Sequence, residues 1–274
     1  MRLLAGLGTR AARLGFGVAV VGVLTFLTLP TLIVVLASFN PTPVLNFPPA
    51  GFSLRWYAML SERPDFWRGL VNTLVVAAGA TALGLVVATG AAVTLQRGRI
   101  AGAHLVAAAL LSPLVVPGVL IGIGLLFVAV HADLVASLWI LLVGHTVMVL
   151  PFALRAIWTS LDELDPILER AAETLGARPA RVLWSVVLPL ARPGLLAAVL
   201  FSAIMSINEF AVSLFLVGRR TQTLPVVLFN YTMAYVDPTI AAVSTVFVAG
   251  TLLVTIVIDR LVGLPRVLRL EEPR

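Results

Sequence analysis

The 274-residue sequence contains no cysteine and no lysine, and it carries little charge of either sign. Without cysteine the chain has no disulfides, no thiolate chemistry and no cysteine-ligated metal site. Without lysine it cannot contain a P-loop, because that motif uses a lysine to reach the nucleotide phosphates. Only 12% of the residues are charged, against about 25% in soluble domains, while 60% are hydrophobic. So few charges cannot cover a water-exposed surface, and we therefore expect an integral membrane protein.

Long apolar segments take the place of a charged surface. An α-helix needs about 20 apolar residues to cross about 30 Å of hydrocarbon. Six segments meet this requirement, at about residues 15–39, 67–95, 104–130, 134–157, 195–217 and 239–262. We therefore predict an all-α membrane protein with six transmembrane helices, in which residues 1–274 form a single domain.

The placement of arginine predicts the orientation of the spans, because cytoplasmic segments carry the excess of basic residues. With the N-terminus in the cytoplasm, only five of the nineteen basic residues fall in outside segments: Arg55, Arg63, Arg68, Arg219 and Arg220. Both termini and the segment at about 158–190 then face the cytoplasm. The arginines of the predicted cytoplasmic segments thus account for the formal net charge of +6. We therefore predict contact with a lipid membrane and no nucleic-acid partner.

The segment at about 158–190, called the cytoplasmic segment below, is the longest polar part of the chain. Asp165 and Pro166 predict a helix start, since aspartate caps helix N-termini and proline fits the first helical position. Gly176 predicts its end, because the residue after a helix often needs a positive φ. A second short helix is expected from Pro179 to Val187, ended by Pro189. The segment could be an amphipathic connector on the membrane surface, but its acidic face would be repelled by anionic headgroups.

The stretch "AAETLGARPARVLWSVVLP", residues 171–189, resembles the cytoplasmic motif of the membrane subunits of binding-protein-dependent ABC importers. In that family the motif is Glu-Ala-Ala, three residues, glycine, nine residues, an aliphatic residue, one residue and Leu-Pro. Arg170 stands where the family has its first glutamate, so which acid takes that role stays open. The stretches "NTLVVAAGATALGLVVATGAAVTLQR" and "LSPLVVPGVLIGIGLLF" also look like the family's second and third spans. The positions that match the motif are Ala171, Ala172, Gly176, Val186, Leu188 and Pro189.

The resemblance implies a permease fold like that of type I ABC importers, in which the cytoplasmic segment forms coupling helices. These helices would sit in a groove of a separate ATPase, with Leu175 and Ala172 packed into the socket and Gly176 allowing a sharp turn. ATP binding would close an ATPase dimer and rock the spans from inward-open to outward-open. The coupling residues implied in this way are Glu169, Arg170, Ala171, Ala172, Glu173, Leu175, Gly176, Arg178, Leu188 and Pro189.

The same resemblance implies the partners and the location. The chain would be a transport subunit without its own catalytic site or bound cofactor, and ATP and Mg²⁺ would sit on the partner ATPase. Its other partners would be a second permease subunit, normally a different chain in the spermidine/putrescine branch, and an extracytoplasmic substrate-binding protein. The location would be the bacterial plasma (inner) membrane, with a multi-pass topology.

Glu209 is the one acid deep within a predicted span, and a charge there costs at least about 2 to 3 kcal/mol. It could form a structural ion pair or hydrogen bond, or it could face the translocation pathway with Ser206 and Asn208. A carboxylate in the pathway would favour a cationic passenger. The surrounding "INEFAVSLFLVG" looks most like the spermidine/putrescine branch, and importers of iron, thiamine or phosphonate are the alternatives. His145 and His104 lack the clustered partners of a metal site, and an interhelical hydrogen bond is the expected role of each.

Other classes of membrane protein fit the sequence less well. An ion-coupled secondary transporter predicts intramembrane charge pairs and internal repeats, and the sequence shows one acid and no repeat. A membrane enzyme needs a catalytic constellation in its spans, and none is visible. A scaffold or receptor subunit leaves the motif of the cytoplasmic segment unexplained.

Overall fold

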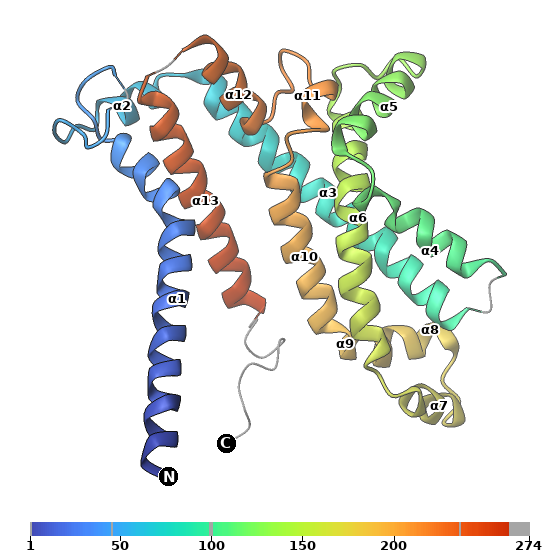
Figure 1. The fold of residues 1–274 in the computed structure, drawn as a ribbon. Helices are drawn as coiled ribbons and strands as arrows, with labels where there is room; N and C mark the ends of the chain where they lie inside the picture. Colours follow the sequence, from blue (N-terminus) through green and yellow to red (C-terminus); the bar gives the residue numbers. More distant parts are fainter. Residues whose placement is uncertain (1, 45, 99–100, 236, 263–274) are drawn as a thin grey trace. The chain divides into compact units, whose positions relative to one another are not determined.

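The computed structural model describes residues 2–44, 46–98, 101–235 and 237–262 (Figure 1). Every regular element within these ranges is helical. The expectation of an all-α membrane protein is therefore confirmed. The chain divides into two compact parts, which are residues 1–63 with 231–248 and residues 64–230 with 249–274.

The first part contains α1 (Arg2–Ala37), α2 (Arg55–Ser61) and the beginning of α13 (Thr239–Val262). The short α2 is fixed to the end of α1 by two hydrogen bonds: Tyr57 shares one of 2.6 Å with the Ser38 hydroxyl, and the Trp56 indole donates one of 2.6 Å to the Asn40 carbonyl. These bonds position the segment that follows the first span.

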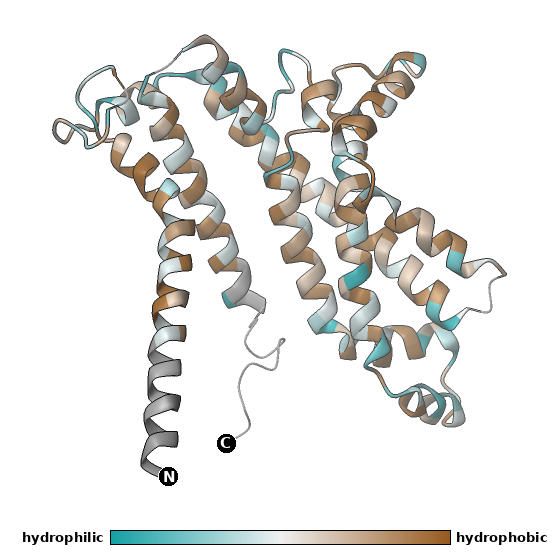
Figure 2. Cartoon of the chain, viewed as in Figure 1, coloured by the Kyte–Doolittle hydropathy of each residue, from teal (hydrophilic) through white to brown (hydrophobic). Residues whose placement is uncertain are grey.

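The second part is built around α3 (Pro64–Arg97), α6 (Leu138–Asp162) and α10 (Arg192–Ile207), which pack against one another (Figure 1). Small side chains make this close packing possible, as in other membrane helices. At Gly194 of α10, an added Cβ atom would lie 2.7 Å from the Ala156 carbonyl oxygen of α6, so only glycine fits the contact. These helices carry exposed large hydrophobic side chains, among them Val86, Trp139 and Phe201, and Figure 2 shows the helices as largely hydrophobic.

Four helices within the described ranges are long and apolar enough to cross a membrane, or up to six if each of two bent helix pairs is one span. The predicted spans at 15–39, 67–95, 134–157 and 239–262 correspond to α1, α3, α6 and α13. The other two predicted spans are not continuous helices in the structure.

The predicted span at 104–130 is broken at Pro117. It consists of α4 (Ala103–Leu111), a 3-10 turn η1 (Ser112–Leu114) and α5 (Gly118–His131), with a bend of 106° between the two halves. Proline has no N–H to continue a helix, and it disfavours the helical conformation at the residue before it, here Val116. The structure therefore bends sharply at this proline.

The predicted span at 195–217 is also broken. The helix α10 ends at Ile207, and only a short α11 (Ser213–Leu216) follows after residues 208–212. A further helix, α12 (Leu224–Ala234), lies between the predicted spans at 195–217 and 239–262. Glu209 is therefore in a helix break and not inside a helix.

Candidate functional site

The cytoplasmic segment begins with α7 (Pro166–Thr174), whose two ends are fixed as the sequence predicts. The Asp165 carboxylate accepts a hydrogen bond of 2.9 Å from the Ile167 N–H, which satisfies one of the unpaired donors at the helix start. Gly176 has a φ of +85°, and the Ala177 N–H donates to the Ala172 carbonyl at 3.1 Å. This is the glycine-terminated cap that the sequence predicts.

The second helix of the cytoplasmic segment runs further than expected. It comprises α8 (Pro179–Val182), a π-helical turn η2 (Leu183–Val187) and α9 (Leu188–Leu190), so Pro189 does not end it. In an α-helix the ring of Pro189 would clash with the Ser185 carbonyl, and the wider π turn removes that clash. Val182 and Val187 are buried in the same core cluster as Ala153 and Ala198. The second helix is therefore part of the folded core.

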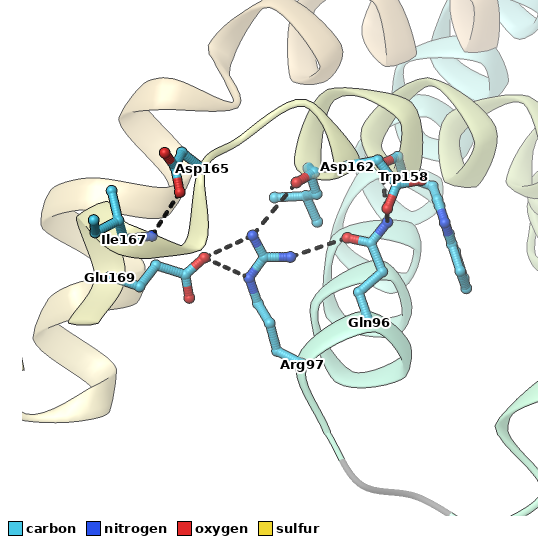
Figure 3. Close-up of polar contacts among 8 residues, drawn as sticks. Gln96, Arg97, Trp158, Asp162, Asp165, Ile167 and Glu169 are labelled. Atoms are coloured by element: carbon cyan, nitrogen blue, oxygen red, sulfur yellow. Dashed lines mark hydrogen bonds and ion pairs between the residues drawn. The ribbon is translucent and has the colours of Figure 1, made fainter.

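An ion pair ties α7 to the end of the second span (Figure 3). The guanidinium of Arg97, the last residue of α3, contacts the Glu169 Oε1 atom through Nε at 2.8 Å and through Nη2 at 2.7 Å. The two side chains are only 25% and 21% exposed. Water screens such a pair less than an exposed one, so this contact fixes the orientation of α7.

Gln96 extends the same network to α6. Its amide nitrogen donates to the Trp158 carbonyl at 3.0 Å and to the Asp162 carboxylate at 2.8 Å. Its amide oxygen accepts a bond of 3.0 Å from Arg97 Nη1. The ends of α3 and α6 and the start of the cytoplasmic segment are therefore joined by one network, which we call the Arg97 network: Gln96, Arg97, Trp158, Asp162 and Glu169.

The expected coupling residues fall into three groups. Glu169 belongs to the Arg97 network, and Ala172 is half-buried against this chain's own core cluster. Leu188 and Pro189 are half-buried. The exposed group consists of Arg170, Ala171, Glu173, Leu175, Gly176 and Arg178.

Large apolar side chains are exposed on the otherwise polar segment. Leu175 is 89% exposed and Ile167 is 61% exposed, and Leu168 is exposed as well. In Figure 2 this part of the chain also carries many hydrophilic residues. Apolar side chains rimmed by polar ones are typical of a surface that another molecule covers.

The three residues proposed for the pathway lie at the break after α10, and they differ in environment. Asn208 is exposed, and its amide donates to the Ile204 carbonyl at 2.8 Å, which covers one end of α10. Glu209 is only 8% exposed, and its Oε1 atom accepts a bond of 2.9 Å from the Val212 N–H. Ser206 is buried. Glu209 thus stabilises the break by binding a backbone donor that no helix satisfies.

His145 of α6 makes the interhelical contact expected of it. Its Nδ1 atom lies 2.7 Å from the Ser206 hydroxyl and its Nε2 atom lies 2.8 Å from the Ser213 hydroxyl, so it joins both sides of the break. No local pattern in the sequence points to Ser213, because the pairing depends on the break itself. Among the described residues, no group of three histidines, cysteines or acids could hold a metal ion.

Comparisons with known proteins agree with this architecture. Residues 81–265 match the family of binding-protein-dependent transport system inner membrane components. The putrescine transport system permease protein PotI of Escherichia coli (strain K12) is 30% identical over 82% of this chain and 83% of its own length. The spermidine/putrescine transport system permease protein PotC of the same strain is 27% identical over 90% of this chain and 92% of its own.

The fold is also similar to that of a solved transporter. A chain from a bacterial ABC transporter involved in the import of the acidic polysaccharide alginate has a TM-score of 0.71, with 16% identity, over 93% of this chain and 96% of that one. At this identity the likeness concerns the fold alone. The family match, over residues 81–265, covers most of the chain and includes the whole cytoplasmic segment. The chain therefore belongs to the family of binding-protein-dependent transport system inner membrane components, and it is a permease subunit of an ABC importer.

Proposed function

We propose that this permease moves a polyamine from an extracytoplasmic binding protein across the bacterial inner membrane into the cytoplasm by alternating access. The names of the relatives PotI and PotC supply the substrate class. The orientation predicted from arginine placement puts both termini and the cytoplasmic segment on the inner side. The complete importer contains a second permease subunit, a different chain, and an ATPase dimer that holds ATP and Mg²⁺.

The cytoplasmic segment is the proposed contact with the ATPase. The observation that carries this proposal is that α7 and its C-cap residue have one exposed side, while the other side is bound to the end of α3. Leu175 and Ile167 are largely exposed, whereas Glu169 is bound to Arg97 at the end of α3. A partner that moves the exposed side of α7 therefore pulls on the second span through an ion pair.

Glu209 is the proposed source of cation preference, with Asn208 exposed beside it. A carboxylate of low exposure close to a break in the fifth span is rare in membrane proteins and is usually functional. Its bond to the Val212 N–H uses one oxygen, Oε1. A cationic cargo in the pathway would be attracted by the same charge.

The proposal is tested first with the assembled importer. The tagged chain is purified in mild detergent, its partners are identified by mass spectrometry, and uptake of radiolabelled putrescine and spermidine is measured in proteoliposomes with ATP inside. We expect a P-loop ATPase and a second permease in the sample, and uptake that needs ATP. Uptake of iron, thiamine or a phosphonate in place of polyamines would refute the substrate class. Uptake driven by an ion gradient with no ATPase in the sample would refute the ATP-driven mechanism.

Glu209→Gln separates the two roles of this side chain. Glutamine keeps an acceptor oxygen for the Val212 N–H and removes only the charge, so the break and the membrane insertion should be preserved. We expect putrescine uptake to fall at least about tenfold, a loss of one favourable charge contact of about 1.4 kcal/mol. Uptake equal to that of the wild type would show that Glu209 serves the structure of the break alone.

A further inference from the structure

The loop at residues 218–223, called the arginine loop, carries Arg219 and Arg220 next to each other on a fixed backbone. The Asn72 amide of α3 donates to the Arg220 carbonyl at 3.0 Å and to the Gln222 carbonyl at 2.9 Å. The Thr221 hydroxyl donates to the Ala136 carbonyl at 3.1 Å. These bonds hold the loop against two other segments, so the backbone that carries the two arginines is constrained.

The two arginines are exposed, and their guanidinium groups have no partner among the residues that the structure describes. The other arginines predicted to lie outside all have one. Arg55 donates to the Pro41 carbonyl at 3.0 Å, Arg63 lies 5.0 Å from the Tyr231 ring centroid, and Arg68 pairs with Asp65 at 3.1 Å. Within the part of the chain that the structure describes, Arg219 and Arg220 are therefore cations without a bonding partner.

Arg68 reinforces the charge of the loop. Together with Asp65 and Asn72 it lines a small concavity that Arg219 and Arg220 also line. Three cations and one anion leave this surface positive. Basic residues are disfavoured on the outer side of a membrane protein. Two neighbouring arginines there, with no bonding partner among the described residues, therefore indicate a role other than anchoring the chain in the membrane.

The position along α3 indicates which side this surface faces. Asp65 and Arg68 are in the first turns of α3, whereas Arg97 of the Arg97 network is its last residue. A helix of 34 residues is about 50 Å long. The arginine loop is therefore at the end of α3 opposite to the proposed ATPase contact, on the extracytoplasmic side.

We propose that the arginine loop, with Arg68, docks an acidic surface of the extracytoplasmic binding protein; this inference rests on the proposed function and its orientation. A positive surface repels a polyamine, so it does not serve to attract the cargo itself. It does suit the protein that carries the cargo, since complementary charges steer partners together and fix their register. The fixed backbone of the loop reduces the entropy lost when the partner binds.

The test uses the complete importer in nanodiscs of neutral phosphatidylcholine, with the binding protein that stimulates wild-type ATP hydrolysis as the probe. The measured quantity is the concentration of binding protein that gives half of the maximal stimulation. For R219E/R220E we expect it to rise about tenfold, since each exposed charge contact contributes about 0.2–1 kcal/mol. Hydrolysis without the binding protein should be unchanged, and R219K/R220K, which keeps both charges, should stay close to the wild type.

Salt supplies a second measurement, and R219Q/R220Q a second variant if the reversed charges impair folding. Raising the ionic strength should weaken stimulation of the wild type more than that of R219Q/R220Q, because screening acts on the charges that this variant lacks. Half-maximal concentrations equal to the wild-type value in both charge variants would overturn the docking proposal. So would a defect that arises only in nanodiscs with anionic lipid, since that would identify a headgroup as the occupant. A wild-type complex that hydrolyses no ATP at any binding-protein concentration would instead refute the proposed function.

Discussion

Replacing Arg97 by methionine tests whether the cytoplasmic segment and the second span are mechanically joined. Methionine keeps most of the side-chain volume and removes the two charge-assisted contacts to Glu169, at 2.7 and 2.8 Å. Such bonds contribute about 1.5–3 kcal/mol each, but these two share one oxygen and are partly exposed, so we take about 2 kcal/mol for the pair. That corresponds to roughly a thirtyfold shift toward α7 detached from α3.

The absence of cysteine makes a distance measurement direct. Thr94 of α3 and Thr174 of α7 are both exposed, so each can be replaced by cysteine and spin-labelled with no competing thiol. Double electron–electron resonance in nanodiscs should give a narrow distance distribution when Arg97 is present. With Arg97→Met the distribution should broaden, and polyamine uptake per ATP hydrolysed should fall, because motion of α7 is no longer passed to α3.

A nearby arginine provides the control. Arg170→Met removes an exposed cation from α7 itself, and the distance distribution should then match that of the wild type. Arg97→Lys keeps the charge without the planar guanidinium, so an intermediate broadening is expected. A distribution for Arg97→Met as narrow as that of the wild type, with normal uptake per ATP, would refute the idea that this ion pair transmits the motion.

Three further substitutions have defined outcomes. Gly176→Val should abolish uptake while the protein still inserts into the membrane, because a φ of +85° costs a residue with a side chain about 1–2 kcal/mol even though no atom lies near the added Cβ. Gly176→Asn should retain much of the uptake, because asparagine tolerates this φ. Equal uptake by the two variants would contradict this reasoning. Gly194→Leu should lower the amount of folded protein seen by fluorescence-detected size exclusion, since α6 backbone lies where its Cβ atom would be; normal yield would show that the contact is not tight. His145→Phe should lower the melting temperature in detergent, because the buried Ser206 hydroxyl loses its partner at about 1–3 kcal/mol, while the Ser213 hydroxyl keeps only its bond to the Glu209 carbonyl. His131→Phe, at an exposed site, should leave the melting temperature nearly unchanged.

The features that depend on nearby residues could be predicted from the sequence. The membrane class follows from charge and hydropathy. The ends of α7 follow from Asp165, Pro166 and Gly176, because capping is a contact between neighbours in the chain. The motif around Gly176 could be compared with that of a family because it is defined by the spacing of residues within one short stretch of the chain.

The features that join distant residues could not be predicted in this way. Arg97 contributed only to the count of inner arginines, and its partner Glu169 lies 72 positions further on. Nothing local links the two, since the contact exists only because α3 and α6 bring their ends together. The same holds for His145 and the hydroxyls of Ser206 and Ser213.

The breaks in the third and fifth spans lie between these two cases. A proline such as Pro117 in a membrane helix can produce a slight kink or a bend of 106°. Which one occurs depends on whether neighbouring helices satisfy the freed backbone groups. The sequence by itself thus determined that the chain lies in a lipid membrane, how many apolar segments it has, and where the cytoplasmic helix is capped. Only the tertiary structure decided where the spans break and which charges meet, because both depend on the helices packed around them.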